Sequence, residues 1–511
     1  MERTTDEKGA RFTKPWARCV GSDRVSTMLR GEYWERFRTL REVMPVDYIR
    51  CHGLLCDELG VARRREWEGK KVLAFNFAYL DQIFDTMRDH RVRPFVELGF
   101  MPEAMASGSQ TVFWWKGNVT PPAEWDEWAG LVTALVRHWI ERYGIDEVRR
   151  WPFEVWNEPN LAVFWKDADQ AAYFKLYEVT VRAIKAVDSS IDVGGPAICG
   201  GMDHWIDDFL GFVKAKSLPL DFFSRHLYAG QTPSLTTPEF LYQNLADPQK
   251  PVDELREVRK RISENGFGSL PLHITEFNTS WHPLCPVHDT PYNAAYLGRL
   301  LSEAGRYAES LSYWTFCDLF EEADVGPSLF HGGFGMIARH GILKPTFHLF
   351  AFFNRMGETV LRRDDHCLVT RRSDGTVAMV AWNPVQTADS GGDRRAVSVS
   401  VPWGSGPALA LRRRVSEKWG NPWGEWRRMG RPKNPGPAAV DFLKAAAAPR
   451  VETAVIDPIG ESLRIECTLT RNEITLVEFV PFADESAAYL GLDDARIDGY
   501  TMETGTPGSL S

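Results

Sequence analysis

The sequence predicts an α/β fold, a (β/α)8 TIM barrel, followed by an accessory C-terminal β-sandwich domain. Through the first two thirds of the chain, short apolar runs that end in polar or Gly residues alternate with longer amphipathic segments. Beyond about residue 355 only strand-like alternation remains, with a hairpin signal at Asp374-Gly375. An open doubly wound sheet usually has a Gly-rich phosphate turn after its first strand, and VGSDR matches that turn poorly. The closed barrel is therefore favoured over the open doubly wound sheet.

The barrel region can be divided into strands and helices in order. Apolar runs predict strands at 16–21, 46–55, 92–100, 153–160, 191–198, 220–228, 270–278 and 311–320. Apolar residues at three- and four-residue steps predict helices at 31–44, 80–90, 125–144, 171–188 and 291–308. This alternation of strand and helix is typical of a barrel of eight βα units.

The change from alternating strands and helices to strands alone, near residue 355, sets the expected domain boundary. We expect the barrel at residues 14–350 and the β-sandwich at 351–490, with residues 1–13 as a candidate addition to the sandwich. Residues 491–511 are expected to form a polar tail. The basic stretch from Arg412 to Lys433 is interrupted by Gly and Pro, so it is interpreted as a solvated loop.

Composition excludes several classes of protein. The formal net charge of -9 argues against nucleic acid as a partner. The chain has no run of 18 apolar residues, so no membrane helix is expected, and its polar N-terminus carries no secretory pattern. The eight cysteines are scattered without a CxxC pair and do not indicate a disulfide framework. These features predict a soluble, cytoplasmic protein.

Two glutamates close predicted barrel strands. Glu158 ends the fourth strand in FEVWNEPN, and Glu276 ends the seventh in HITEFN. The carboxyl ends of barrel strands share one mouth, where the chemistry of these folds takes place. Two carboxylates there suit glycoside hydrolysis, in which one protonates the leaving oxygen and the other attacks or activates water. Glu158 follows apolar residues and is assigned as the general acid, and Asn157 as a donor to a sugar hydroxyl.

A structural role is the alternative for each of these acids. A strand-end glutamate can also cap a helix or pair with an arginine, so either position alone would be ambiguous. The pairing of two mutually consistent positions favours chemistry. Glu97 ends the third strand without a second supporting feature, and we interpret it as a structural partner.

Aromatic and histidine side chains also follow barrel strands. Sugar rings stack their C–H faces on aromatic rings, and the candidates are Trp114, Trp115, Trp281 and Trp314. Hydrogen bonds to sugar hydroxyls are expected from His52, His226 and Tyr228. No HxH or HExxH spacing occurs, so no metal site is predicted. Roles in the core or as satisfied structural histidines remain the alternative for each residue.

Longer motifs resemble glycoside hydrolase family 39, and specifically its bacterial β-xylosidases. The likeness covers most of the chain and includes RCHGLLCDELG, FEVWNEPNLAVFWKDADQAAYF, SRHLYAG, LPLHITEFNTSW and SYWTFCDLFEE. The resemblance implies a retaining mechanism with Glu158 as acid/base and Glu276 as nucleophile, and Asn157 at the sugar 2-hydroxyl. It implies no cofactor and a homo-oligomer, often a tetramer. It also implies a terminal-sugar subsite lined by His52, Phe113, His226, Tyr228, Trp314, Glu321 and Glu322.

One position departs from the family pattern. Where the family tends to read NTSY, this chain reads NTSW, so that Trp281 replaces a tyrosine whose phenol would reach the nucleophile. The expected function is a retaining exo-β-xylosidase that releases xylose from the non-reducing end of short β-xylo-oligosaccharides. The first alternative is the same machinery acting on a β-galactoside, an α-L-arabinoside or an iduronide. The second is a non-catalytic carbohydrate-binding barrel.

Overall fold

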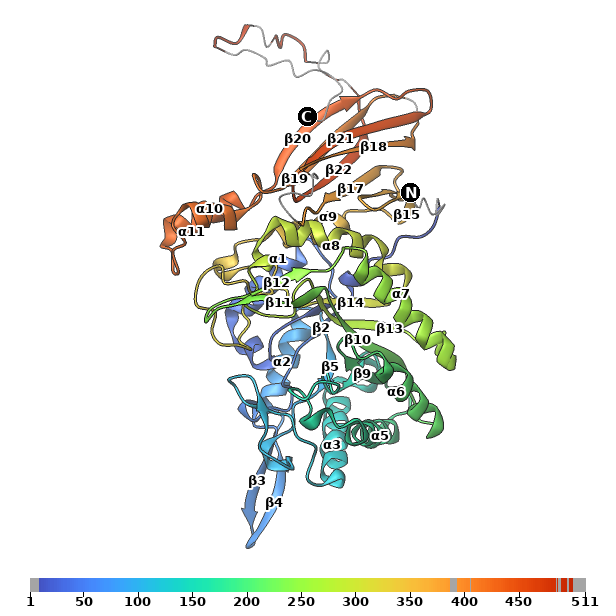
Figure 1. Ribbon diagram of the computed structural model, residues 1–511, viewed down its shortest axis with the longest axis vertical. Helices are drawn as coiled ribbons and strands as arrows, with labels where there is room; N and C mark the ends of the chain where they lie inside the picture. Colours follow the sequence, from blue (N-terminus) through green and yellow to red (C-terminus); the bar gives the residue numbers. More distant parts are fainter. Residues whose placement is uncertain are drawn as a thin grey trace.

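The structure is a computed structural model that describes residues 9–386, 393–404, 406–483, 485, 489–493 and 496–499. Figure 1 shows a barrel surrounded by helices, with a β-sheet domain stacked on one side of it. The expected tail at 491–511 lies mostly outside the described residues, as do residues 1–8 of the N-terminal segment. No described helix is both long and apolar enough to cross a membrane.

Eight parallel strands close the barrel, which confirms the predicted fold class. Around the barrel their order is β1, β14, β13, β10, β9, β8, β5 and β2. Each predicted strand is present but shorter than its apolar run, because several runs continue into turns at the strand ends. The strands are Cys19–Gly21 (β1), Tyr48–Arg50 (β2), Arg93–Leu98 (β5), Phe153–Val155 (β8), Val193–Ile198 (β9), Phe222–Tyr228 (β10), Leu272–Asn278 (β13) and Ser310–Tyr313 (β14).

Amphipathic helices cover the outside of the barrel. In α3, the apolar residues Leu131, Val132, Leu135 and Val136 are fully buried, and their three- and four-residue steps place them on one face. The helices are Gly31–Arg41 (α1), Ala78–Asp89 (α2), Trp125–Tyr143 (α3), Ile145–Val148 (α4), Gln170–Val187 (α5), His204–Ala215 (α6), Lys250–Ile262 (α7), Pro291–Glu303 (α8) and Pro345–Asn354 (α9).

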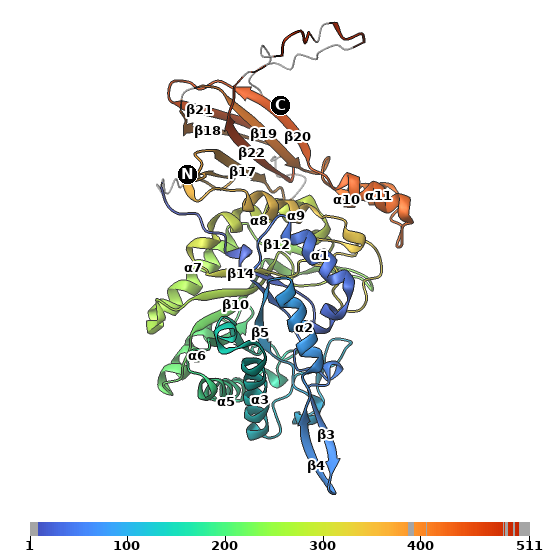
Figure 2. The same cartoon turned by 180° about the vertical axis from the view of Figure 1, so that it is seen from behind.

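Small hairpins extend the loops that follow barrel strands. After β2 comes the hairpin of β3 (Ala62–Trp67) and β4 (Lys70–Phe75), which projects away from the barrel in both views (Figures 1 and 2). After β5 come β6 (Thr111–Val112) and β7 (Gly117–Asn118), and after β10 come β11 (Gly230–Thr236) and β12 (Leu241–Leu245). Long loops at this end of a barrel supply the walls of its substrate site.

The C-terminal domain has two layers of antiparallel strands. A six-stranded sheet of order β15, β16, β17, β22, β19, β20 faces a two-stranded sheet of β18 and β21, and apolar side chains from both fill the space between them. In β18, Val397, Val399 and Val401 alternate with exposed residues, as expected for one buried face. The strands are Thr359–Arg363 (β15), Cys367–Arg371 (β16), Val377–Asn383 (β17), Arg394–Pro402 (β18), Ala408–Val415 (β19), Arg450–Ile456 (β20), Ser462–Thr470 (β21) and Glu473–Pro481 (β22).

The described N-terminal segment and the domain junction lie near β15, the first strand of this sheet. The backbone N–H of Phe12 donates to Glu358 and that of Gly9 to Val360, so this N-terminal segment lies along β15. The last barrel helix, α9, ends at Asn354, and four residues separate it from β15.

The basic stretch from Arg412 to Lys433 is not a loop. Arg412 and Arg414 belong to β19, where both side chains are buried and form ion pairs with Glu473 of β22. Farther along lie two helices, Pro422–Arg428 (α10) and Pro437–Ala446 (α11). The side chain of Asn421 accepts from the N–H of Gly424 and caps α10. The loop prediction was wrong for two reasons. Alternate residues of a strand are buried, so arginines can lie inside β19. The helices α10 and α11 offer few signals in the sequence, because capping and apolar positions are few.

Candidate active site

A pocket of ≈ 710 Å³ opens at the carboxyl ends of the barrel strands. Its size suits a small ligand. Nine of the eleven residues expected at the site line it: His52, Phe113, Asn157, Glu158, Tyr228, Glu276, Trp281, Trp314 and Glu322. The remaining two, His226 and Glu321, lie behind or beside it.

Glu158 follows β8 in a sharp turn. Trp156 and Glu158 have positive φ angles of 73° and 44°, a region that side chains adopt rarely and that bends the chain after the strand. The N–H of Glu158 donates to the carbonyl of Ala197 at 3.0 Å, which ties the turn to β9. Burial raises the pKa of the Glu158 carboxyl well above its ordinary value, and the charge of Glu276 raises it further. These surroundings hold Glu158 as a proton donor.

Glu276 lies near the end of β13 among hydrogen-bond donors. Arg50 donates to its Oε1 at 2.7 Å and the hydroxyl of Tyr228 donates to its Oε2 at 2.7 Å. A guanidinium beside a carboxylate compensates its negative charge, and a phenol adds a second donor. Glu276 is therefore oriented as an anion while Glu158 is kept neutral.

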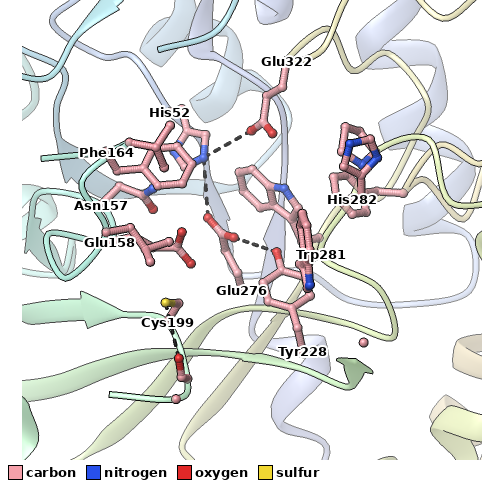
Figure 3. A pocket seen from close by; sticks show the side chains of 18 of the residues that line it. His52, Asn157, Glu158, Phe164, Cys199, Tyr228, Glu276, Trp281, His282 and Glu322 are labelled. Carbon is pink, nitrogen blue, oxygen red and sulfur yellow. Dashed lines mark hydrogen bonds and ion pairs between the residues drawn. The ribbon is translucent and has the colours of Figure 1, made fainter. Parts of the chain in front are cut away.

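The two carboxylates face each other across the pocket (Figure 3). One oxygen of Glu158, one of Glu276 and a ring nitrogen of His226 lie within 4.8 Å of one another. Retaining glycosidases hold their two carboxyl groups about 5–5.5 Å apart, whereas inverting enzymes need about 6.5–9.5 Å to admit a water molecule. The separation matches the retaining geometry.

His226 lies beneath the pocket floor, fully buried. Its Nδ1 is 2.7 Å from Oε1 of Glu158. Burial lowers the pKa of His226 well below its usual value, and the charge of Arg50 lowers it further, so the ring is neutral. A neutral ring that donates Nδ1–H to Oε1 leaves the other oxygen of Glu158 to carry the acid proton.

Arg50, which the sequence analysis did not select, connects the whole site. It ends β2, is fully buried, and donates to Glu154 at 2.6 Å and to Asn157 at 2.9 Å as well as to Glu276. It also lies 2.9 Å from Glu97. A buried cation requires such partners. The signal available in the sequence was a lone arginine inside an apolar run, two residues before His52.

His52 lies close to three glutamate side chains on the opposite wall of the pocket. Its Nδ1 is 2.7 Å from Glu97, and its Nε2 is 3.4 Å from Glu322 and 3.5 Å from Glu276. Burial would lower the pKa of His52, but the carboxylates of Glu97 and Glu322 raise it well above its usual value. Burial also raises the pKa of Glu322 to about 7. Glu97 thus pairs with Arg50 and His52, as expected for a structural partner.

Glu321 does not line this pocket, in contrast to what the family resemblance implied. Arg30 donates to both of its carboxylate oxygens at 2.6 and 3.0 Å, and Arg24 donates at 2.9 Å. It lies instead beside a smaller neighbouring cavity. The physical reason is that Glu321 and Glu322 are adjacent in a loop without helix or strand, so that only Glu322 faces the pocket while the arginines hold Glu321 outside it.

The tryptophans differ in their relation to the pocket. Trp314 is buried in its wall, whereas Trp114 and Trp115 do not line it. Trp281 is 45% exposed. Among the described residues, the phenol that reaches Glu276 belongs to Tyr228, and no hydrogen bond from Trp281 to Glu276 is present. Trp281 itself lines the pocket from the loop beyond β13, next to His282 and Pro283.

A (β/α)8 barrel with one such carboxylate just after its fourth strand and another near the end of its seventh defines a glycoside hydrolase. Residues 2–462 match the family model of glycosyl hydrolases family 39, and the chain belongs to this family.

Curated relatives and solved structures agree with this assignment. The chain is 48% identical over 493 residues to a β-xylosidase of Geobacillus stearothermophilus, covering 96% of this chain and 97% of that protein. It is 40% identical over 356 residues to a β-xylosidase of Caldicellulosiruptor saccharolyticus, covering 68% and 70%. A crystal structure described as a monomeric β-xylosidase from Caulobacter crescentus superposes with a TM-score of 0.84 at 34% identity, covering 94% and 99%.

Proposed function

We propose that this chain is a retaining exo-β-xylosidase that releases xylose from the non-reducing end of short β-xylo-oligosaccharides, a step in xylan degradation. The observation that carries the proposal is the approach of the Glu158 and Glu276 carboxylates to within 4.8 Å.

In the first step, an oxygen of Glu276 attacks the anomeric carbon while Glu158 gives its proton to the leaving glycosidic oxygen. The C1–O bond breaks and a covalent glycosyl ester forms on Glu276. Arg50 and Tyr228, hydrogen-bonded to Glu276, keep its carboxylate oriented for attack. In this proposal Asn157, whose amide oxygen accepts from Arg50, donates its amide N–H to the sugar 2-hydroxyl.

In the second step, ionised Glu158 takes a proton from water as that water attacks C1. The ester bond breaks, Glu276 returns to a carboxylate, and Glu158 regains the proton it gave away. Two displacements at one carbon leave the product with the configuration of the substrate.

A neutral terminal sugar suits the far wall of the pocket. His52 and Glu322 offer a donor and an acceptor for sugar hydroxyls, while Phe113 and Trp314 offer ring surface. Two relatives, at 48% and 40% identity, are named β-xylosidases.

A panel of 4-nitrophenyl glycosides tests the sugar. We expect kcat/KM for the β-xyloside to exceed that for the β-galactoside, the α-L-arabinoside and the α-L-iduronide. A higher value for any of these three would reject xylose as the preferred sugar while leaving the machinery intact. Absence of turnover on all four, in protein that is folded, would favour the non-catalytic carbohydrate-binding barrel.

We also propose a cytoplasmic homo-oligomer, with a tetramer as the specific expectation. All eight cysteines are free thiols, which suits a reducing compartment. The projecting β3–β4 hairpin carries Trp67 at 66% exposure, an apolar surface suited to a neighbouring subunit. Light scattering after size-exclusion chromatography measures the subunit number, and a monomeric mass, as described for the Caulobacter relative, would reject this assembly.

A further inference from the structure

A second cleft, of ≈ 670 Å³, lies where the barrel meets the C-terminal domain. Its walls come from three places: the start of α8 near Pro291, the turn between β21 and β22 at Arg471 and Asn472, and the segment around α10. Figures 1 and 2 show α10 and α11 projecting from the sheet domain at this junction. We call it the arginine cleft. It shares no lining residue with the catalytic pocket.

The arginine cleft is strongly basic. Four arginines line it, Arg427, Arg428, Arg431 and Arg471, against a single acid, Glu417. The whole chain has a formal net charge of -9. Such a concentration of positive charge on an acidic protein creates a local potential that attracts anions.

Two of the arginines are already paired and two are not. Arg471 lies 3.1 Å from Asp393 and 3.4 Å from Glu417, and Arg428 pairs with Glu425. Within the described part of the chain, neither Arg427 nor Arg431 forms an ion pair or a side-chain hydrogen bond. Both side chains are exposed and their donors are free for a ligand.

The surroundings restrain the side chain of Arg427 and the backbone of Arg431. The guanidinium of Arg427 stacks over the ring of Trp423, 4.7 Å from its centroid. Arg431 follows α10 with a φ of 57°, and its N–H donates to the carbonyl of Trp426 at 3.1 Å. Since the stacking restricts the guanidinium of Arg427, less conformational entropy is lost when this group binds a ligand.

The lining also offers surface for sugar rings. Tyr292 is half-buried in the wall, and so is Trp423, whose ring is stacked by Arg427. The planar forks of arginine match carboxylates in a bidentate manner, and aromatic rings take the C–H faces of sugars. Carboxylate and sugar ring occur together in uronic acids.

We propose that the arginine cleft is a non-catalytic binding site for acidic oligosaccharides, in which uronic-acid carboxylates pair with Arg427 and Arg431. The site goes beyond the proposed hydrolytic function and gives the C-terminal domain a role. It recruits charged glycan chains that the overall negative charge of the protein would otherwise repel.

Calorimetric titration of the Glu276→Gln variant, which prevents turnover, tests this proposal. The probes are xylotriose that carries one glucuronic acid and unsubstituted xylotetraose. We expect the acidic probe to occupy a site that the neutral probe does not, with affinity that falls as salt rises. Adding Arg427→Ala and Arg431→Ala should weaken that binding by about tenfold or more, since two charge-assisted contacts are lost.

Arg65, an exposed arginine on β3 with no ion pair among the described residues, gives the matched control, and Arg65→Ala should leave the binding unchanged. Equal stoichiometry for both probes, or binding unaffected by the paired arginine substitutions, would overturn the proposal. So would inorganic phosphate binding to the cleft in place of the acidic probe. Because catalysis is switched off, these outcomes do not depend on which sugar the active site hydrolyses.

Discussion

At the scale of single residues, Glu158 and Glu276 are chemically identical and differ only in their neighbours. Glu158 lies beside a neutral histidine and the charge of Glu276. Glu276 lies between a guanidinium and a phenol. This asymmetry assigns the proton to Glu158 and the negative charge to Glu276, which is how two like groups perform opposite roles.

The pH profile should report this assignment. Because the pKa of Glu158 is raised and its protonated form is required, kcat/KM should fall as pH rises through that pKa. Glu158→Gln should remove this alkaline limb and lower kcat by about 10²–10⁴-fold on alkyl xylosides, whose leaving oxygen needs a proton. On 2,4-dinitrophenyl xyloside the first step should be affected far less. An alkaline limb retained in the variant would assign it to another group, such as Glu322.

Arg50 is a positioning residue whose geometry matters as well as its charge. Arg50→Lys keeps a cation but loses the planar fork that reaches Glu154, Asn157 and Glu276 together. We expect kcat to fall by about 10²-fold because the nucleophile is misplaced, with a smaller change in KM. Steady-state kinetics measure the split. A variant with wild-type kcat would show that the fork is dispensable.

At the scale of elements, a buried lysine anchors the segment that follows β14. Lys344, fully buried, lies 2.7 Å from Asp289 and 2.7 Å from Asp318 and donates to the carbonyl of Gly333 at 2.8 Å. The segment anchored there carries Glu322 and Phe334 into the pocket. A lysine beyond the active site thereby fixes one of its walls.

Lys344→Met should destabilise the fold strongly. Two buried aspartates would lose their cation, and breaking a buried ion pair in this way costs about 3–5 kcal/mol. Denaturant unfolding gives the change. Lys260→Met, on an exposed face with 60% of its side chain accessible, should change stability by less than about 0.5 kcal/mol. Equal effects in the two variants would show that the buried cluster is not stabilising.

The sequence predicted where the helices and strands lie better than it predicted which side chains face the pocket. Glu158 and Glu276 could be paired because parallel strands end at one mouth. Arg50 was missed because its four partners come from three other strands and the loop after one of them. Glu321 was misplaced because a loop has no fixed period from which to tell it from Glu322. The helix α10 was missed because it is seven residues long and rich in Gly, Pro and Arg.

At the scale of the whole molecule, the barrel and the C-terminal sheet share an apolar core. Trp382 of β17 and Leu476 of β22 belong to the same buried cluster as the barrel helices. At Gly298 of α8, an added Cβ would come within 2.6 Å of the Trp382 indole, so only glycine allows this close approach. The sheet domain is thus packed firmly on α8, whose first residues line the arginine cleft.

The central claim is that Glu276 forms a covalent bond with the sugar while Glu158 manages the proton. Incubation with 2,4-dinitrophenyl 2-deoxy-2-fluoro-β-xyloside, followed by mass spectrometry of peptides, tests it most directly, because the fluorine slows breakdown of the intermediate. We predict one fluoroxylosyl group per chain, attached to the peptide that contains Glu276 and absent from the Glu276→Gln variant. Attachment to Glu158, or turnover of the reagent to α-configured sugar without any adduct, would contradict the account.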